Sequence, residues 1–289
     1  MAALRRPTWL ASAAACAVVF VALAGCGRVR EDAPLHTAAA AVTSVPAAAE
    51  LPPVTGLPDL PPNKHGELVR QGHAIFTNTP VFARRFSGNS LSCSSCHLDA
   101  GRRANAAPMW AAWGMYPAYL GKTDRVTTLE ERIQQCFRFS MNGFPPPQDS
   151  QEMRALLTYM QFVSIGQPIG VEQPGRGFPT VPRTGADPDA FRGKAVYAAR
   201  CAQCHGKEGE GVRSPSGAAV FPPLWGHDSF NKGAGMNRID LLAGFVKANM
   251  PYDKPDLTDQ EALDVAAWIT LQERWPDPRK GLITGLLER

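Results

Sequence analysis

Cys93-Ser94-Ser95-Cys96-His97 is the stretch that decides the fold, and it recurs 108 residues later as Cys201-Ala202-Gln203-Cys204-His205. Cys-x-x-Cys-His is the attachment signature of c-type haem, in which both thiols bond covalently to the porphyrin. The adjacent histidine then binds the iron as its proximal ligand. The two copies therefore predict two covalently bound haem c groups, the first on Cys93, Cys96 and His97 and the second on Cys201, Cys204 and His205.

Two other uses of a Cys-x-x-Cys pair are weaker here. A zinc site needs further Cys or His at ligand spacing, and the halves offer only Cys136, His65, His73 and His227. A redox dithiol is typical of a βαβ context, which the sequence does not show. Because both pairs are followed directly by histidine, haem is favoured. His65 and His73 have no role that the sequence assigns.

A second repeated feature marks helix starts. Asp149-Ser150-Gln151-Glu152 recurs 109 residues later as Thr258-Asp259-Gln260-Glu261, with an N-cap acceptor followed three residues on by Glu. Apolar residues at helical spacing follow each copy, and few segments alternate as strands do. The sequence thus predicts an all-α protein with two cytochrome c-type domains, each wrapped around one haem and joined by a Pro/Gly-rich linker.

The N-terminus predicts export. Arg5 and Arg6 precede an apolar stretch, 9–24, that is too short and too Ala-rich to span a membrane comfortably in the mature protein. It ends Leu23-Ala24-Gly25-Cys26, which looks like a bacterial lipobox. We therefore expect a lipoprotein signal peptide over 1–25 and lipid on Cys26, which would anchor the chain at the periplasmic side of a membrane. The alternative is an ordinary secretory signal with a stray cysteine.

Composition gives the remaining boundaries. Residues 26–60 are rich in Ala and Pro and predict an extended tether. Residues 166–187, rich in Gly and Pro, predict a linker between a first haem domain over 61–165 and a second over 188–289. The net charge of +4 is too small to indicate a nucleic-acid partner.

Each iron also has a distal position. Met250 lies 45 residues after His205, in a loop before the last helix, where it resembles the distal ligand of single-haem class I cytochromes c. We therefore predict Met250 as the distal ligand of the second haem, where it would raise the reduction potential. The alternative is that Met250 is core and that Lys247, or nothing, binds the iron.

The first haem has two candidate distal ligands. The internal repeat maps Met250 onto Met141, but Cys136 lies only five residues before Met141. Cys136 is the cysteine left over once the signal, the lipid site and the two haem pairs are counted. A cysteine without a partner in an exported protein needs an explanation.

The helix expected around Cys136 favours a chemical role for it. Thr128 and Glu131 predict a capping box at its start, and Gly143 predicts its end. On such a helix Arg132, Cys136 and Ser140 form an i, i+4, i+8 stripe. Arg132 would favour the thiolate, which is the form that binds iron or attacks sulfur. The bland alternative is an inert core cysteine.

The sequence resembles the thiosulfate dehydrogenases, which are dihaem cytochromes c. The resemblance covers roughly residues 60–275 and is densest in the first half: 87–102, Ala107-Pro108, Trp113-Gly114, 128–133, Cys136-Phe137, 140–143, Asp149-Ser150 and Glu152-Met153. It implies Cys136 as thiolate ligand of the active-site haem, with Arg132 and Ser140 beside it as catalytic residues. One departure is Asn249, because some members carry a lysine beside the methionine as an alternative ligand.

The resemblance implies that two thiosulfate ions are joined into tetrathionate, or the reverse, with two electrons passing through the second haem. The expected acceptor is a soluble or membrane-associated protein such as a cytochrome c. Thiosulfate is a dianion, and residues 102–138 hold cations that could attract it: Arg102, Arg103, Lys122, Arg125, Arg132 and Arg138. Three rival interpretations remain: a non-enzymatic dihaem electron carrier with Met141 on the first haem, a tetrathionate reductase, and an enzyme acting on another small sulfur anion.

Overall fold

A computed structural model describes residues 60–121, 124–183, 185–252 and 254–280. The predicted signal peptide, Cys26 and nearly all of the tether lie outside these residues. The described residues all belong to one compact unit, 48–289. None of the helices in this described part is both long and apolar enough to cross a bilayer.

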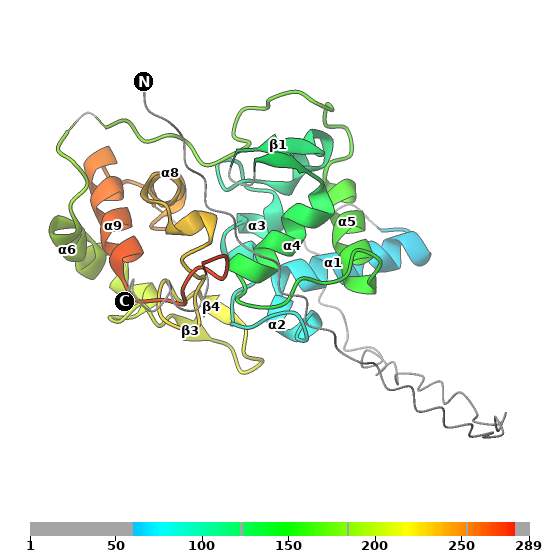
Figure 1. The fold of residues 1–289 in the computed structure, drawn as a ribbon, viewed down its shortest axis with the longest axis horizontal. Coiled ribbons are helices and arrows are strands. Elements are labelled where there is room, and N and C mark those ends of the chain that lie inside the picture. The colour runs from blue at the N-terminus through cyan, green and yellow to red at the C-terminus, as the bar shows by residue number, and fades with distance from the viewer. Residues whose placement is uncertain (1–59, 122–123, 184, 253, 281–289) are drawn as a thin grey trace, which may run out of the picture. The chain divides into compact units, whose positions relative to one another are not determined.

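The described residues of the first half form five α-helices, grouped together in Figure 1: α1 (Lys64–Thr77), α2 (Thr79–Phe82), α3 (Leu98–Gly101), α4 (Leu129–Phe139) and α5 (Gln151–Val163). Short 3-10 turns lie between them at Cys93–Ser95, Met109–Ala111 and Trp113–Met115. α1 packs directly on α5. The two helices are so close that a side chain at Gly72 would overlap the carbonyl of Ala155. Phe76 and Tyr159 meet between these helices, with ring centroids 5.6 Å apart.

The second half follows a similar plan, with four α-helices among its described residues: α6 (Ala190–Arg200), α7 (Ala202–His205), α8 (Ile239–Asn249) and α9 (Asp259–Leu271). A 3-10 turn at Gly235–Asn237 precedes α8. α6 packs against α9 as α1 does against α5, again at a glycine, since Gly193 faces the carbonyl of Asp264. In each half, therefore, the first helix is paired with the last helix.

The predicted helix signals are confirmed in two places and shifted in two. Capping boxes open α4 at Thr128 and α9 at Thr258. At α5 the N-cap is Ser150, one residue after the predicted Asp149, and Ser150 accepts from the Met153 amide. At the end of α4, Asn142 rather than Gly143 takes the left-handed conformation, with φ 49°.

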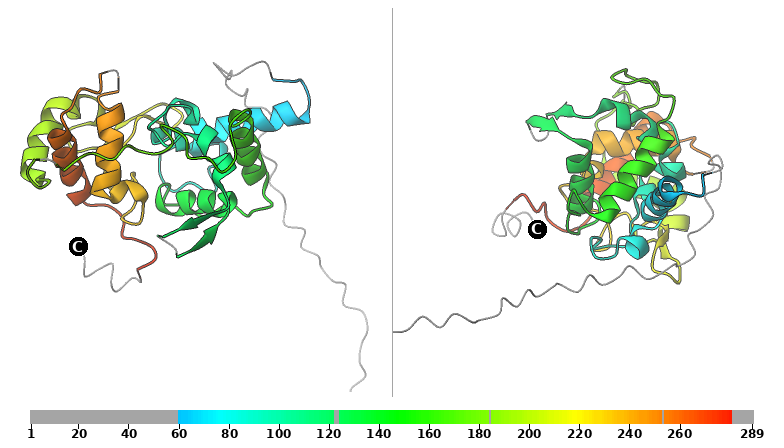
Figure 2. Two further views of the ribbon diagram at one scale, coloured as in Figure 1. Left: turned by 90° about the horizontal axis from the view of Figure 1, so that it is seen from above. Right: turned by 90° about the vertical axis from the view of Figure 1, so that its right-hand side faces the viewer.

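The all-α prediction is wrong in detail, because two short antiparallel ribbons accompany the helices (Figure 2). β1 (Ala118–Leu120) pairs with β2 (Arg125–Thr127), and β3 (Val212–Arg213) pairs with β4 (Ala219–Phe221). Strands of two or three residues are too short to show alternation in a sequence. The described residues thus form two mainly helical halves, each with one small ribbon.

The segment 166–187 lies against the first half up to Gly177 and then against the second, where Arg183 pairs with Asp240 at 2.6 Å. Its described residues form no helix or strand. The amide of Asn105 donates to the carbonyl of Gly175 at 2.7 Å, and that of Ala107 donates to Gly177 at 3.3 Å. The halves also contact each other directly, since the Asn249 amide group donates to the Asn105 carbonyl at 3.0 Å. The bonds from Asn105 and Ala107 fix the segment against the loop that follows the first Cys-x-x-Cys-His motif.

Candidate functional site

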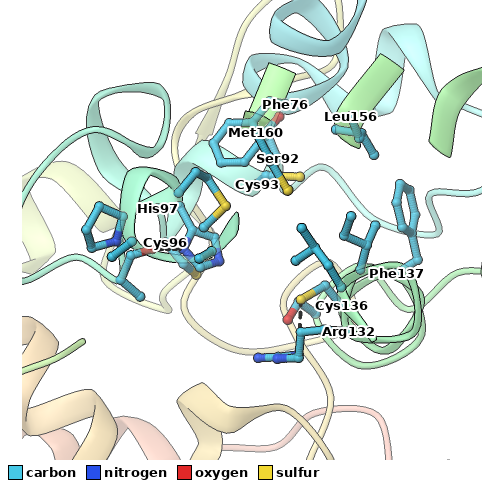
Figure 3. Close-up of a pocket in the computed structure, with 18 of the residues that line it drawn as sticks. Phe76, Ser92, Cys93, Cys96, His97, Arg132, Cys136, Phe137, Leu156 and Met160 are labelled. Carbon is cyan, nitrogen blue, oxygen red and sulfur yellow. Dashed lines mark hydrogen bonds between the residues drawn. The ribbon is translucent and has the colours of Figure 1, made fainter. Parts of the chain in front are cut away.

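A cavity of about 310 Å³ lies in the first half, and the first-site residues predicted from the sequence line it. Figure 3 shows His97 and Cys96 on one wall, with Cys136 and Arg132 on the facing wall. The rest of the lining is mainly apolar and comes chiefly from α1, α4, α5 and the loop after α3. Other segments add Leu91, Ser92, Arg176 and Gly177. Such a predominantly apolar pocket with a few converging polar groups is typical of a cofactor site.

The first wall is built by the Cys93–His97 turn. His97 Nδ1 donates to the Ala107 carbonyl at 2.7 Å, and because a carbonyl only accepts, this bond places the proton on Nδ1. Nε2 is then the nitrogen left for a metal, as in metal-binding histidines generally. Burial raises the pKa of Cys93 and Cys96 to about 12. Such thiols are protonated at neutral pH and are not poised as a redox dithiol.

The facing wall is the buried side of α4. Arg132 Nη1 donates to Cys136 Sγ at 3.2 Å, drawn dashed in Figure 3, so the predicted i, i+4 adjacency is present. Ser140, one turn further on, also lines the cavity. The negative charge that Cys136 carries as a thiolate raises the pKa of Arg132. Arg132 is therefore a permanent cation beside this sulfur.

Met141 is at the same cavity. It is 3% exposed, and its amide donates to the Cys136 carbonyl at 3.1 Å. Both candidate distal ligands, Cys136 and Met141, therefore line one cavity, and the structure does not separate them by position.

Sequence reasoning missed Tyr116 and Arg176, which line this cavity as well. The Tyr116 phenol lies close enough to Arg132 for the two groups to interact electrostatically. Both missed residues lie in irregular segments, and no motif in the sequence marks them.

The other predicted basic residues lie elsewhere. Among the cations between residues 102 and 138 that are described, Arg132 alone lines the cavity. Arg102 pairs with Asp99 at 2.6 Å, and Arg125 pairs with Glu131 at 3.3 Å. The guanidinium of Arg103 lies over the Tyr252 ring. The side chain of Arg138 is exposed. Lys122 is outside the described residues.

The two unassigned histidines do not line the cavity. His65 is exposed, whereas His73 is buried against Tyr159, with ring centroids 5.4 Å apart. Burial lowers the pKa of His73, so it is a neutral packing residue near neutral pH.

The second site has the same proximal geometry. His205 Nδ1 donates to the Pro222 carbonyl at 2.8 Å, which again leaves Nε2 for a metal. Burial raises the pKa of Cys201 to about 11 and lowers that of His205, so the pair is a thiol beside a neutral imidazole. Met250 caps the end of α8 and packs, half-buried, against the core.

The ammonium group of Lys247 is bound to other protein groups. Its ammonium donates to the Leu257 carbonyl at 2.6 Å and pairs with Asp259 at 3.2 Å. The competing assignment of Lys247 as distal ligand would therefore require two contacts to break.

These residues fit haem c. Each half presents a Cys-x-x-Cys-His turn whose imidazole is oriented by a backbone carbonyl, and the first half adds an apolar cavity closed by a sulfur-bearing wall. No cluster of three or more His, Cys, Asp or Glu able to hold a metal occurs in the described ranges, so the zinc alternative gains no support there.

Fold and site together define a two-domain c-type cytochrome. Residues 79–169 match the SoxA/TsdA cytochrome c domain, and residues 190–272 match the cytochrome c family. The chain is 50% identical to a thiosulfate dehydrogenase of Stutzerimonas stutzeri over 232 residues, which are 80% of this chain and 75% of that protein. It is 39% identical to one from Allochromatium vinosum over 257 residues, 86% of this chain and 95% of that protein.

A solved structure agrees. The thiosulfate dehydrogenase (TsdBA) of Marichromatium purpuratum, in its as-isolated form, matches with a TM-score of 0.75 and 47% identity. The match covers 78% of this chain and 51% of that one, so this chain corresponds to about half of the solved chain. The chain belongs to the thiosulfate dehydrogenase family.

Proposed function

We propose that this protein oxidises two thiosulfate ions to one tetrathionate at the first cavity and passes the two electrons to an acceptor through the second haem domain. In this reaction each thiosulfate dianion loses one electron, one sulfur–sulfur bond forms, and no proton is released. The observation that carries the proposal is the 3.2 Å contact from Arg132 to Cys136 on the wall facing His97.

Four residues would hold the irons: His97 and Cys136 at the first site, and His205 and Met250 at the second. Each haem, when bound, supplies a centre that takes up one electron. A thiolate ligand favours a low potential and a methionine a higher one, so this ligand set favours transfer from the first site to the second.

Charge is the main difficulty that the protein must overcome. Two dianions about 5 Å apart repel by on the order of 10 kcal/mol at an effective dielectric constant of about 20. Arg132 supplies a fixed cation at the sulfur of Cys136, and the Ser140 hydroxyl can donate to a sulfonate oxygen. Preorganised donors of this kind stabilise charge without reorganising during the reaction.

A second candidate function has one observation in its favour. Met141 is buried at the same cavity, so a His97/Met141 site would make the protein a dihaem electron carrier without an activity of its own. In that case Cys136 would be a packing residue.

Replacement of Cys136 by Gly distinguishes these functions. We expect thiosulfate-dependent reduction of ferricyanide to fall by more than about 100-fold, while the haem content per chain stays at two. Met141→Leu is the matched control, since it alters the rival ligand at the same cavity, and it should retain activity. Full turnover in the Cys136 variant would refute the catalytic role. Net tetrathionate formation or consumption with high- and low-potential partners gives the working direction.

Two further parts of the proposal rest on sequence alone. They are a lipid anchor at Cys26, which would place the enzyme at the periplasmic side of a membrane, and an acceptor such as a cytochrome c. Cys26→Ser should release the protein from the membrane fraction. If the variant stays in that fraction and the wild type carries no lipid, the anchor assignment is wrong.

A further inference from the structure

Arg176 reaches the first cavity from the segment 166–187, outside the helices that form the walls. The bonds from Asn105 to Gly175 and from Ala107 to Gly177 hold the backbone on either side of it. Packing adds to this restraint, because a side chain at Gly175, where φ is +77°, would crowd Ala104. The segment thus acts as a fixed support for Arg176.

The surroundings of Arg176 are those of a cavity entrance. Its side chain is 33% exposed and pairs at 2.8 Å with Glu172, whose side chain is 73% exposed. Such an exposed ion pair contributes little free energy, so a doubly charged anion can compete with the Glu172 carboxylate.

Tyr116 connects this entrance to the reactive sulfur. Its phenol lines the same cavity and lies close enough to Arg132, Cys136 and Arg176 to interact electrostatically with all three. Arg176, Tyr116 and Cys136 therefore all border this one cavity. Among the described lining residues, Arg132 and Arg176 are the two arginines, and the charge of Arg132 is directed at Cys136. Because Arg132 is engaged by Cys136, Arg176 is the lining arginine that remains to bind a second anion.

We propose that Arg176 and Tyr116 form an anion subsite that holds the sulfonate group of the second thiosulfate ion while its sulfur approaches the first. The guanidinium and the phenol hydroxyl donate to sulfonate oxygens, and the planar guanidinium suits bidentate contact with them. This inference rests on the proposed function. A haem propionate is also an anion that arginine binds, so the test must separate the two sources.

The experiment compares steady-state thiosulfate oxidation by the holoprotein and three variants. Arg176→Gln should raise KM about tenfold and lower kcat less than about threefold, because a charged hydrogen bond to substrate is lost. Glu172→Gln removes the competing carboxylate and should lower KM about twofold. Arg183→Gln is the matched control, since Arg183 lies on the same segment but pairs with Asp240 at 2.6 Å, and it should leave KM unchanged.

The reduction potential and visible spectrum of the first haem give the second readout. We expect Arg176→Gln to leave both unchanged. A shifted potential with an unchanged KM would assign Arg176 to a propionate and overturn the subsite. An active wild type with a wild-type KM in Arg176→Gln would refute the subsite alone, whereas a wild type inert toward thiosulfate would refute the proposed function and the subsite with it.

Discussion

Replacing Arg132 by Gln tests the role of the cation beside Cys136. The substitution removes the hydrogen bond from Arg132 Nη1 to Cys136 Sγ, 3.2 Å long, and leaves the sulfur without that positive charge. Hydrogen bonds to charged groups contribute about 1.5–3 kcal/mol. At about 1.4 kcal/mol for each factor of ten, kcat/KM for thiosulfate should fall by roughly 10- to 150-fold.

The assay is ferricyanide reduction at several thiosulfate concentrations, with haem content measured on the same samples. Arg132→Lys keeps the charge without the planar fork and should fall between wild type and Gln. Arg138→Gln is the control, because Arg138 lies on the same helix with its side chain exposed. A kcat/KM for Arg132→Gln within twofold of the wild-type value would contradict the reasoning.

Two predictions concern stability. Gly143→Ala should lower the free energy of unfolding by about 1–3 kcal/mol or more, since its Cβ would overlap the Phe86 carbonyl, whereas Gly121→Ala, with open space around it, should be neutral in the same denaturant titration. Hydrogen bonds from the Thr258 amide and hydroxyl hold the pKa of Glu261 below its ordinary value, so its stabilising effect is complete at neutral pH and is lost as pH falls through that lowered pKa. The stability difference between wild type and Glu261→Gln should therefore shrink on acidification, and a difference that grows instead would be inconsistent with the cap.

The parts of the site that depend on local sequence could be predicted. Cys93, Cys96 and His97 belong to one short turn, so their proximity follows from the motif itself. Arg132 and Cys136 are four apart on a helix whose capping box was readable, and this spacing places them on one face.

The parts that depend on tertiary contacts could not. Tyr116 and Arg176 meet the cavity because non-local backbone bonds hold irregular segments there, and nothing in their own neighbourhood encodes this. Gly143 illustrates a related error. It is a natural helix stop by sequence, yet the structure needs its missing side chain to approach Phe86, while Asn142 takes the left-handed turn.

The choice between Cys136 and Met141 is a third case. The internal repeat selects Met141, whereas the helix stripe selects Cys136. The turn after α4 returns the Met141 amide to the Cys136 carbonyl, so both side chains lie at the cavity. Geometry alone therefore leaves two sulfur atoms available, and the chemistry of the first haem depends on which of them binds.

Low-temperature EPR of the oxidised holoprotein, with matching absorption spectra, tests this central claim most directly. We expect wild type to give one low-spin signal of a thiolate-ligated haem and one of a His/Met haem. The thiolate signal should disappear in Cys136→Gly and persist in Met141→Leu. Two His/Met signals in wild type, with one lost in Met141→Leu, would contradict the account.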